Sequence, residues 1–398
     1  MISFLSSYHE ISLPLNIFLF FSIFFLNFLI PILIANKFKL NLQVPIILVS
    51  ANFIFYLIYL IFVEFTGSDG LSFFNEKLQN NIYPFYIRDN FIIKLSLTFR
   101  DLKIHFLIVT LFTNILSAVS FLLIYIKLKE NEIITNFTYF FIFFMVCISG
   151  VLFWSNGLLK DNFVLFAVTL FLFSVNSNSI NFKILVPAII ICLIIRPLIG
   201  FFILLSLFIF YNIYLLLKKN LSGILKINFF SLIPLFILIN FILSQYSLTF
   251  DLTIFQQILD EVFVLSNSFK DPNFADGYLT YDTSKLAFYE LYFIYYFGPL
   301  IPLSPLYLFA FISLQNLANL LILIVFIFNI IFNFRKFKEF LIFSKFQTIF
   351  FLYSILYTLI VPLTCYNLGI AFRQKWMCLI ILIYIMLFFI SYCRRKKI

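Results

Sequence analysis

The sequence predicts an all-α, polytopic integral membrane protein with about 11 transmembrane helices and two long outer loops. Hydrophobic residues occupy 63% of the 398 positions and charged residues only 11%, with a mean hydropathy of +1.09. A soluble domain of this length would need far more polar surface to cover its core. Apolar runs recur from end to end at about the length of a membrane-spanning helix. They are continuous, whereas the strands of a membrane barrel alternate apolar and polar residues.

Eleven apolar runs count as crossings, provided that 184–195 and 198–217 form a bent pair within one membrane domain covering residues 1–398. The runs are 13–35, 43–63, 105–126, 135–153, 162–175, 184–195, 198–217, 228–248, 306–333, 347–363 and 376–393. The first should be retained as a span, because no Lys or Arg precedes it and a cleavable signal needs a basic start. A further apolar stretch, 286–303, contains Glu290 and prolines, and we place it at the membrane interface.

The distribution of charge predicts the orientation. With the N-terminus outside and the C-terminus inside, the inner segments hold 16 of the 27 basic residues but only three of the 17 acidic residues. The inner face is then +13 and the outer face −3, and positive charge is the kind retained inside. The net positive charge of the chain is therefore explained by its topology and by anionic lipid on the inner leaflet. It gives no reason to expect nucleic acid as a partner.

Both long loops, 64–104 and 249–285, fall on the outer, periplasmic-type face, and every inner connection is short. Only nine Gly are present, and no GxGxxG or phosphate-binding loop exists, which disfavours a nucleotide-driven pump. The five Cys and two His show no ligand spacing, so we expect neither a metal nor another cofactor. Within the second loop, apolar residues at spacings of three and four predict a helix along the outer surface: Leu252, Phe255, Leu259 and Phe263.

Four features place ionisable groups at or near the depth of the bilayer, where charge indicates function. In "WSNGLLKDN", which we place in the tight outer turn between two spans, Lys160 and Asp161 follow Trp154. They form either an interfacial anchor or one edge of a phosphate site at the start of a helix. In "CLIIRPLIGFF", Arg196 precedes the helix-breaking Pro197. It is either a hinge residue that snorkels or a bidentate phosphate ligand.

The other two features lie in predicted outer turns. "TCYNLGIAFRQKW" places Arg373 and Lys375 on the side that usually disfavours cations, which suggests an anionic partner or a plain interfacial turn. "FTGSDGLSFF" places Asp69 just beyond the membrane, where its carboxylate could act as a general base on a sugar hydroxyl or cap a helix.

All four features fall on the outer face and could converge into one polar site for an anionic lipid carrier and an acceptor hydroxyl. Arg196 in particular needs compensation at its depth, since an unpaired charge there costs on the order of 3 kcal/mol. An internal carboxylate, Asp161 or Asp69, would compensate it in a structural role. A lipid phosphate would compensate it in catalysis.

The segments "FWSNGLLKD", "IRPLIGF", "YYFGPLIPLSPLYLFAFISLQNL" and "NLGIAFRQKW" together resemble bacterial O-antigen and oligosaccharide repeat-unit polymerases, relatives of the GT-C glycosyltransferase superfamily. The resemblance implies polymerisation or transfer of undecaprenyl-(pyro)phosphate-linked sugars on the periplasmic side of the inner membrane. It implies no nucleotide cofactor, and other polysaccharide-assembly proteins as partners. It also implies that Arg196 and Arg373 engage the lipid pyrophosphate and that Asp69 acts as the base. Lys160, Asp161, Lys375 and Trp154 would then help to bind the substrate.

Other classes remain open at this stage. An O-antigen ligase would need a His in a large outer loop, and 249–285 has none; a membrane O-acyltransferase would need a His at bilayer depth, which suits neither His9 nor His105. A repeat-unit flippase or transporter usually shows internal repeats and evenly spaced spans, and neither is found here. A purely structural membrane subunit would not need Arg196 at a helix break.

Overall fold

The structure is a computed structural model of the 398-residue chain. It describes residues 13–66, 87–133, 136–138, 140–141, 155–157, 160–220, 324–364 and 368–395, and isolated positions between 222 and 321. Throughout these residues the chain is almost entirely helical, with one isolated β-bridge between Val175 and Ile180. Five of the described helices are long and apolar enough to cross a membrane. The prediction of an all-helical, membrane-embedded chain is confirmed at that level.

The chain divides into two compact units. The first holds Met1–Phe141, Val151–Ser174 and Phe182–Arg196, and the second holds Ile142–Gly150, Val175–Asn181 and Pro197–Ile398. The described helices of unit 1 are α2 (Leu13–Lys37), α3 (Gln43–Thr66), α5 (Ile87–Asp101), α6 (Phe106–Glu130), α9 (Lys160–Ser174) and α10 (Phe182–Ile195). Those of unit 2 are α11 (Pro197–Leu217), α16 (Phe334–Phe343), η3 (Lys345–Gln347), α17 (Thr348–Ile360), η4 (Val361–Thr364) and α18 (Leu368–Arg395).

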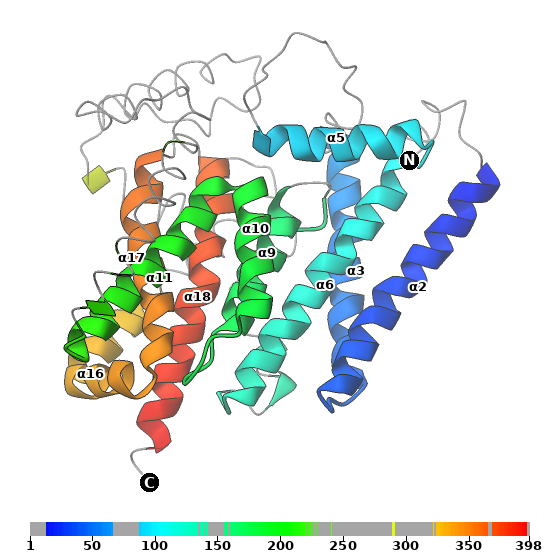
Figure 1. Cartoon of the computed structure of the whole chain (residues 1–398). Helices are drawn as coiled ribbons and strands as arrows, with labels where there is room; N and C mark the ends of the chain where they lie inside the picture. The colour runs from blue at the N-terminus through cyan, green and yellow to red at the C-terminus, as the bar shows by residue number, and fades with distance from the viewer. Residues whose placement is uncertain are drawn as a thin grey trace. The chain divides into compact units, whose positions relative to one another are not determined.

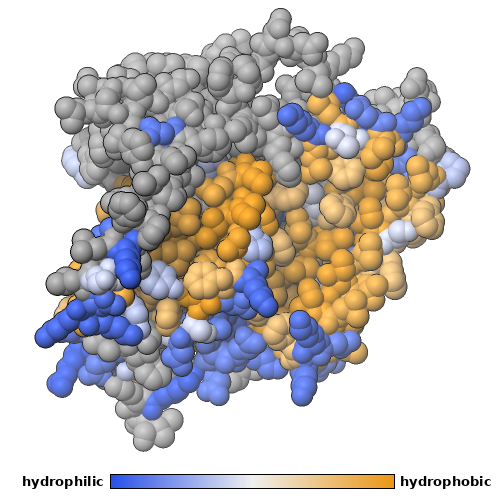
Figure 2. All heavy atoms as spheres, in the orientation of Figure 1, coloured by the Kyte–Doolittle hydropathy of each residue, from blue (hydrophilic) through white to orange (hydrophobic). Residues whose placement is uncertain are grey.

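In unit 1, α2 and α6 run parallel and α3 runs antiparallel to them (Figure 1). Asn16 at the start of α2 donates from Nδ2 to the carbonyl of Lys103 just before α6, at 3.1 Å, and Asn27 donates to the carbonyl of Leu111 at 3.1 Å. α5 lies across the end where α3 finishes and α6 begins. In Figure 2, apolar side chains cover the visible flank of this unit between two hydrophilic rims, as lipid contact requires.

α9 and α10 form a hairpin that is shorter than α6. Helices of 15 and 14 residues span about 22 Å, whereas the 25 residues of α6 span about 37 Å. The end of α9 is level with the end of α6, because Lys127 Nζ lies 3.5 Å from the carbonyl of Phe173. The opposite end of the hairpin is where α9 begins and α10 finishes, and α10 also contacts α5.

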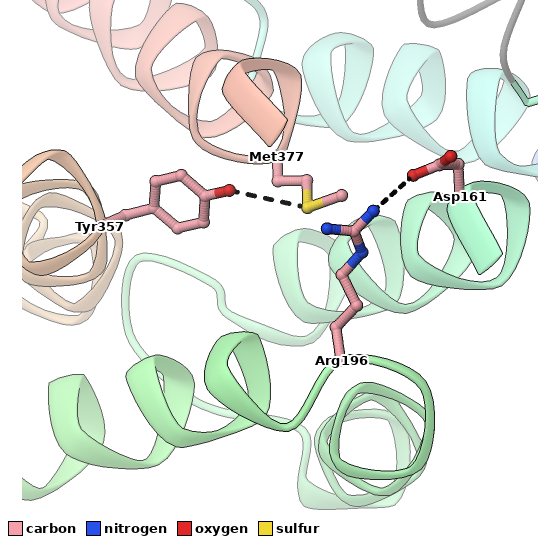
Figure 3. A network of polar contacts seen from close by, with 4 residues as sticks. All are labelled: Asp161, Arg196, Tyr357 and Met377. Carbon is pink, nitrogen blue, oxygen red and sulfur yellow. Dashed lines mark hydrogen bonds and ion pairs between the residues drawn. The ribbon is translucent and has the colours of Figure 1, made fainter. Parts of the chain in front are cut away.

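In unit 2, α17 runs antiparallel to both α11 and α18. Phe202 near the start of α11 packs on Tyr357 near the end of α17, with ring centroids 5.9 Å apart, and Phe210 packs on Phe346, which precedes α17. Across the other interface, Tyr357 Oη donates to Met377 Sδ at 3.7 Å, as drawn in Figure 3. The ends of α11 and α18 consequently lie on the same side of unit 2 as the start of α17.

This helix order gathers basic residues at one end of each unit. In unit 1 that end contains Lys37 as the last residue of α2, Lys39 just after it, Lys129 at the end of α6 and Lys183 at the start of α10. In unit 2 the corresponding residues are Lys218, Lys219, Arg335, Lys336, Lys338, Arg394 and Arg395. All of them belong to segments that the charge pattern assigned to the inner face, although the direction in which either end faces stays a prediction.

Two boundaries differ from those predicted. Residues 87–101 of the first predicted outer loop form helix α5. This segment alternates charged residues with apolar ones, and apolar side chains such as Leu97 are buried on one side of the helix. The last helix begins at Leu368 rather than near 376, since no residue between these positions breaks it. The predicted helix in 249–285 and the interfacial stretch 286–303 lie outside the described residues, except for Tyr289 and Glu290, which are helical.

Candidate functional site

A buried ion pair lies where the α9–α10 hairpin opens. Asp161 is in the first turn of α9, and Arg196 follows the last residue of α10 (Figure 3). Arg196 Nη2 donates to Asp161 Oδ1 at 3.0 Å, and the two side chains are 15% and 2% exposed. The sequence suggested two carboxylates that could pair with Arg196, Asp161 and Asp69, and in the structure Arg196 pairs with Asp161.

The backbone explains why Arg196 lies at the end of a helix. Its N–H still bonds to the carbonyl of Cys192 at 2.7 Å, so it completes the last turn of α10. Pro197 then starts α11, because proline has no N–H to continue a helix but fits a first helical position. The guanidinium is thus carried by the last turn of α10, directly before the residue at which α11 begins.

Asp161 also occupies a favourable position in α9. The free N–H groups of the first turn of a helix carry partial positive charge, which stabilises a carboxylate there. At the other end of α9, the buried Lys127 approaches the carbonyl of Phe173, in the last turn, which carries partial negative charge. Charges of opposite sign therefore complement both ends of this helix inside unit 1.

The guanidinium keeps hydrogen-bonding capacity after it has paired with Asp161. Arginine carries five N–H groups in a planar fork. Nη2 binds the carboxylate, whereas Nε is buried and has no hydrogen-bond partner among the described residues. The guanidinium can therefore donate a hydrogen bond to a further oxygen atom while it remains bound to Asp161.

The turn that precedes α9 is buried, although the sequence suggested an outer turn. Ser155 and Asn156 are 1% and 0% exposed. Thr113 Oγ1 donates to the carbonyl of Gly157 at 3.3 Å, and Asn162 Nδ2 donates to the same carbonyl at 2.7 Å. Because Thr113 is seven residues into α6, this turn lies about 10 Å along the helix from its start.

A network of amides and hydroxyls holds this turn against α3 and α6. Asn114 Nδ2 donates to Asn156 Oδ1, and Asn52 Nδ2 donates to the carbonyl of Asn114 at 3.2 Å. Ser117 Oγ donates to Asn52 Oδ1 at 3.2 Å and lies 2.7 Å from Ser155 Oγ. These side chains stand in for water that the hydrocarbon interior lacks, and they fix the start of α9, and so Asp161, relative to α6.

The packing of Gly157 against Tyr59 gives a direct test of this arrangement. A Cβ built on Gly157 would lie 2.3 Å from Tyr59 Oη, and Tyr59 is fully buried. We expect Gly157→Ala to destabilise the protein by about 1–3 kcal/mol, the usual cost of overpacking. Thermal unfolding of the purified protein in detergent measures this loss.

Tyr59→Ala provides the matched partner for Gly157→Ala, because it removes the ring that the new methyl group meets. The double variant should lose less stability than the sum of the two single variants, since the residues are in direct contact. Additive losses would contradict the packing described here.

The structure brings together two of the seven site residues predicted from the sequence, Asp161 and Arg196. Lys160 is the first residue of α9, while Arg373 and Lys375 lie in the first two turns of α18; the side chains of all three are outside the described part of the structure. Asp69 and Trp154 also lie outside it. The sequence interpretation missed the buried polar network around the turn: Asn52, Asn114, Ser117, Ser155, Asn156 and Asn162.

A signal for part of this network is present in the sequence. Along α6, polar residues recur at spacings of three, one, three and three, and all are buried: Thr110, Thr113, Asn114, Ser117 and Ser120. They form a polar stripe on one side of an otherwise apolar helix, which indicates interhelical hydrogen bonding.

No known protein family, curated protein or solved structure matches this chain. The described residues contain no group of three or more His, Cys, Asp or Glu that could hold a metal ion.

Proposed function

We propose that the protein is a membrane glycosyltransferase of the polysaccharide-polymerase type, which binds the (pyro)phosphate of an undecaprenyl-linked sugar through Arg196. The observation that carries this proposal is the buried Arg196–Asp161 pair at a helix break, with the Nε of Arg196 still available. Asp161 holds the planar guanidinium in one orientation, and its remaining N–H groups bind phosphate oxygens.

The depth of the pair suits a lipid-linked substrate. The turn before α9 lies about 10 Å along α6 from the end that α5 crosses. A polyprenyl chain enters the hydrocarbon region, so its phosphate can reach a cation that lies slightly below the membrane surface. Under the predicted topology this end faces outward, where the lipid-linked sugars would be presented. Asp69, Arg373 and the side chains of Lys160 and Lys375 would complete the site.

Deletion of the gene tests the proposed function. We expect the cell to lose long-chain surface polysaccharide while single repeat units still reach the outer face of the membrane. The purified protein should also lengthen undecaprenyl-pyrophosphate-linked oligosaccharides without any nucleotide. If single repeat units fail to reach the outer face, the protein is a flippase and the proposal is wrong.

The topology that this function requires can be measured by cysteine labelling. In a variant with its native cysteines replaced by Ala, Lys94→Cys on α5 should react with a membrane-impermeant reagent from outside. Lys336→Cys on α16 should react only after the membrane is opened, because basic ends are retained inside. The reverse pattern would place the Arg196–Asp161 pair nearer the inner face and exclude a periplasmic reaction there.

A further inference from the structure

Helix α16 has one side that is packed into unit 2. Phe337 and Phe340 are 6% and 0% exposed. Their rings lie 5.1 and 5.5 Å from the ring of Phe389 in α18, and Phe340 also lies 5.6 Å from Tyr392. In Figure 1, α16 runs across the end of unit 2 from which the C-terminus emerges. The helix is thus fixed beside the last turns of α18.

The other side of α16 carries positive charge. Arg335 and Lys338 are exposed, Lys336 is partly exposed, and Glu339 is the one acidic residue of the helix. Arg335 Nε and Glu339 Oε1 are 3.7 Å apart, but the Arg335 side chain is 94% exposed, and exposed pairs of this kind contribute little. α16 therefore presents a net charge of +2.

The end of α18 adds two more cations next to this side. Arg394 and Arg395 follow Tyr392, whose ring packs on Phe340 of α16. Arg395 Nη2 donates to Ser391 Oγ at 3.4 Å, within the same helix. In Figure 2, hydrophilic side chains gather at this end of the unit. Five cations and one carboxylate lie on these two adjacent helix ends, counted over the described residues.

Exposed apolar residues border the same cations. Residues 324–332 are helical, and the chain turns at Asn333 before α16 begins. Ile331, Phe332 and Phe334 at this turn are 62%, 77% and 66% exposed. Bulky apolar side chains beside lysines and arginines are typical of a helix that lies at the boundary between headgroups and acyl chains.

We propose that α16 and the end of α18 form a docking surface for anionic phospholipid headgroups, and that these lipids hold α16 in its place against α18. The charge on the surface selects anionic over zwitterionic lipid, because the negative surface potential of an anionic membrane attracts each Lys or Arg near it. The exposed Phe332 and Phe334 enter the acyl region while the cations bind phosphate oxygens. This proposal is independent of the reaction proposed for Arg196.

Hydrogen exchange of the full chain in lipid nanodiscs tests it. The nanodiscs contain phosphatidylcholine alone or mixed with phosphatidylglycerol, and exchange of the amides in 334–343 is followed by mass spectrometry. We expect phosphatidylglycerol to slow their exchange severalfold, and high salt to remove most of this effect. Equal exchange in the two lipid mixtures would overturn the proposal without any variant.

The triple variant Arg335→Gln, Lys336→Gln, Lys338→Gln should lose the effect of phosphatidylglycerol. A matched control removes the same charge from unit 1, through Lys37→Gln, Lys39→Gln and Lys129→Gln, and should keep it. Protection of the α6 amides from hydrogen exchange shows whether each of the two triple variants is folded. If the triple variant responds to phosphatidylglycerol as the wild type does, the lipid binds elsewhere. Should the triple variant fail to fold, Lys338→Gln alone, at an exposed position, should still reduce the effect, and an unchanged response there would overturn the proposal.

Discussion

Asp161→Asn is expected to destabilise the folded protein by about 3 kcal/mol, because it leaves the guanidinium of Arg196 in a largely buried position without its counter-charge. Arg196→Gln should have an effect of similar size, since the carboxylate of Asp161 is only 2% exposed. Asp161→Asn nearly keeps the shape of the side chain, and Arg196→Gln keeps a polar group at the end of a shorter side chain. The loss is measured by thermal or denaturant unfolding of the purified protein in one detergent.

The double variant Asp161→Asn, Arg196→Gln separates the charges from the packing. Two neutral side chains can hydrogen-bond to each other, and replacing both members of a buried ion pair costs much less than removing one. We therefore expect the double variant to be more stable than either single variant, with a coupling free energy of about 1–3 kcal/mol. Strictly additive losses would show that the two groups are not paired in the folded protein.

Most of the described membrane helices could be predicted from the sequence because the hydrocarbon region imposes a strong one-dimensional signal. α2, α3 and α6 begin within one residue of the predicted runs 13–35, 43–63 and 105–126. Their ends extend further, since charged residues such as Lys129 can continue a helix into the interface. α10 and α11 separate at Arg196–Pro197, where proline and charge coincide.

Burial of the turn before α9 could not be predicted in the same way. Ser155, Asn156 and Gly157 have the composition of an exposed turn. Their burial depends on the side chains that α3 and α6 offer, above all Asn52 and Asn114, which lie far away in the sequence. Polar turn residues can enter a membrane-embedded unit only where such partners satisfy them, so tertiary structure decides their depth.

The candidate site, too, could be predicted from the sequence only in part. The sequence identified Arg196 from its charge and helix break, and it named Asp161 and Asp69 as carboxylates that could compensate it. Choosing between them requires the fold, because 34 residues separate Asp161 from Arg196 and the short α9–α10 hairpin brings them together. Whether Arg373 and Lys375 complete the site stays a prediction.

Arg196→Lys is expected to abolish long-chain polysaccharide while the protein is still inserted at normal levels. Lysine keeps the positive charge, so the carboxylate of Asp161 keeps a counter-ion and the fold should survive. It loses the planar fork, and in the proposed function that fork allows one guanidinium nitrogen to bind Asp161 while others bind phosphate. A lysine ammonium at this position would be engaged by Asp161 as a point charge. The measurement is polysaccharide chain length in the deletion strain that carries the variant, with protein levels determined in the membrane fraction.

Two further variants make this result specific to Arg196. Lys94→Ala removes an exposed cation from α5 in the same unit and should leave the polysaccharide unchanged, because Lys94 has no part in the proposed site. The neutral pair Asp161→Asn, Arg196→Gln should be folded yet inactive, since stability is partly restored but the phosphate ligand is absent. Normal polysaccharide in Arg196→Lys and in the neutral pair would mean that Arg196 only joins two helices. The phosphate would then have to bind other cations, and Arg373 and Lys375 would be the next positions to test.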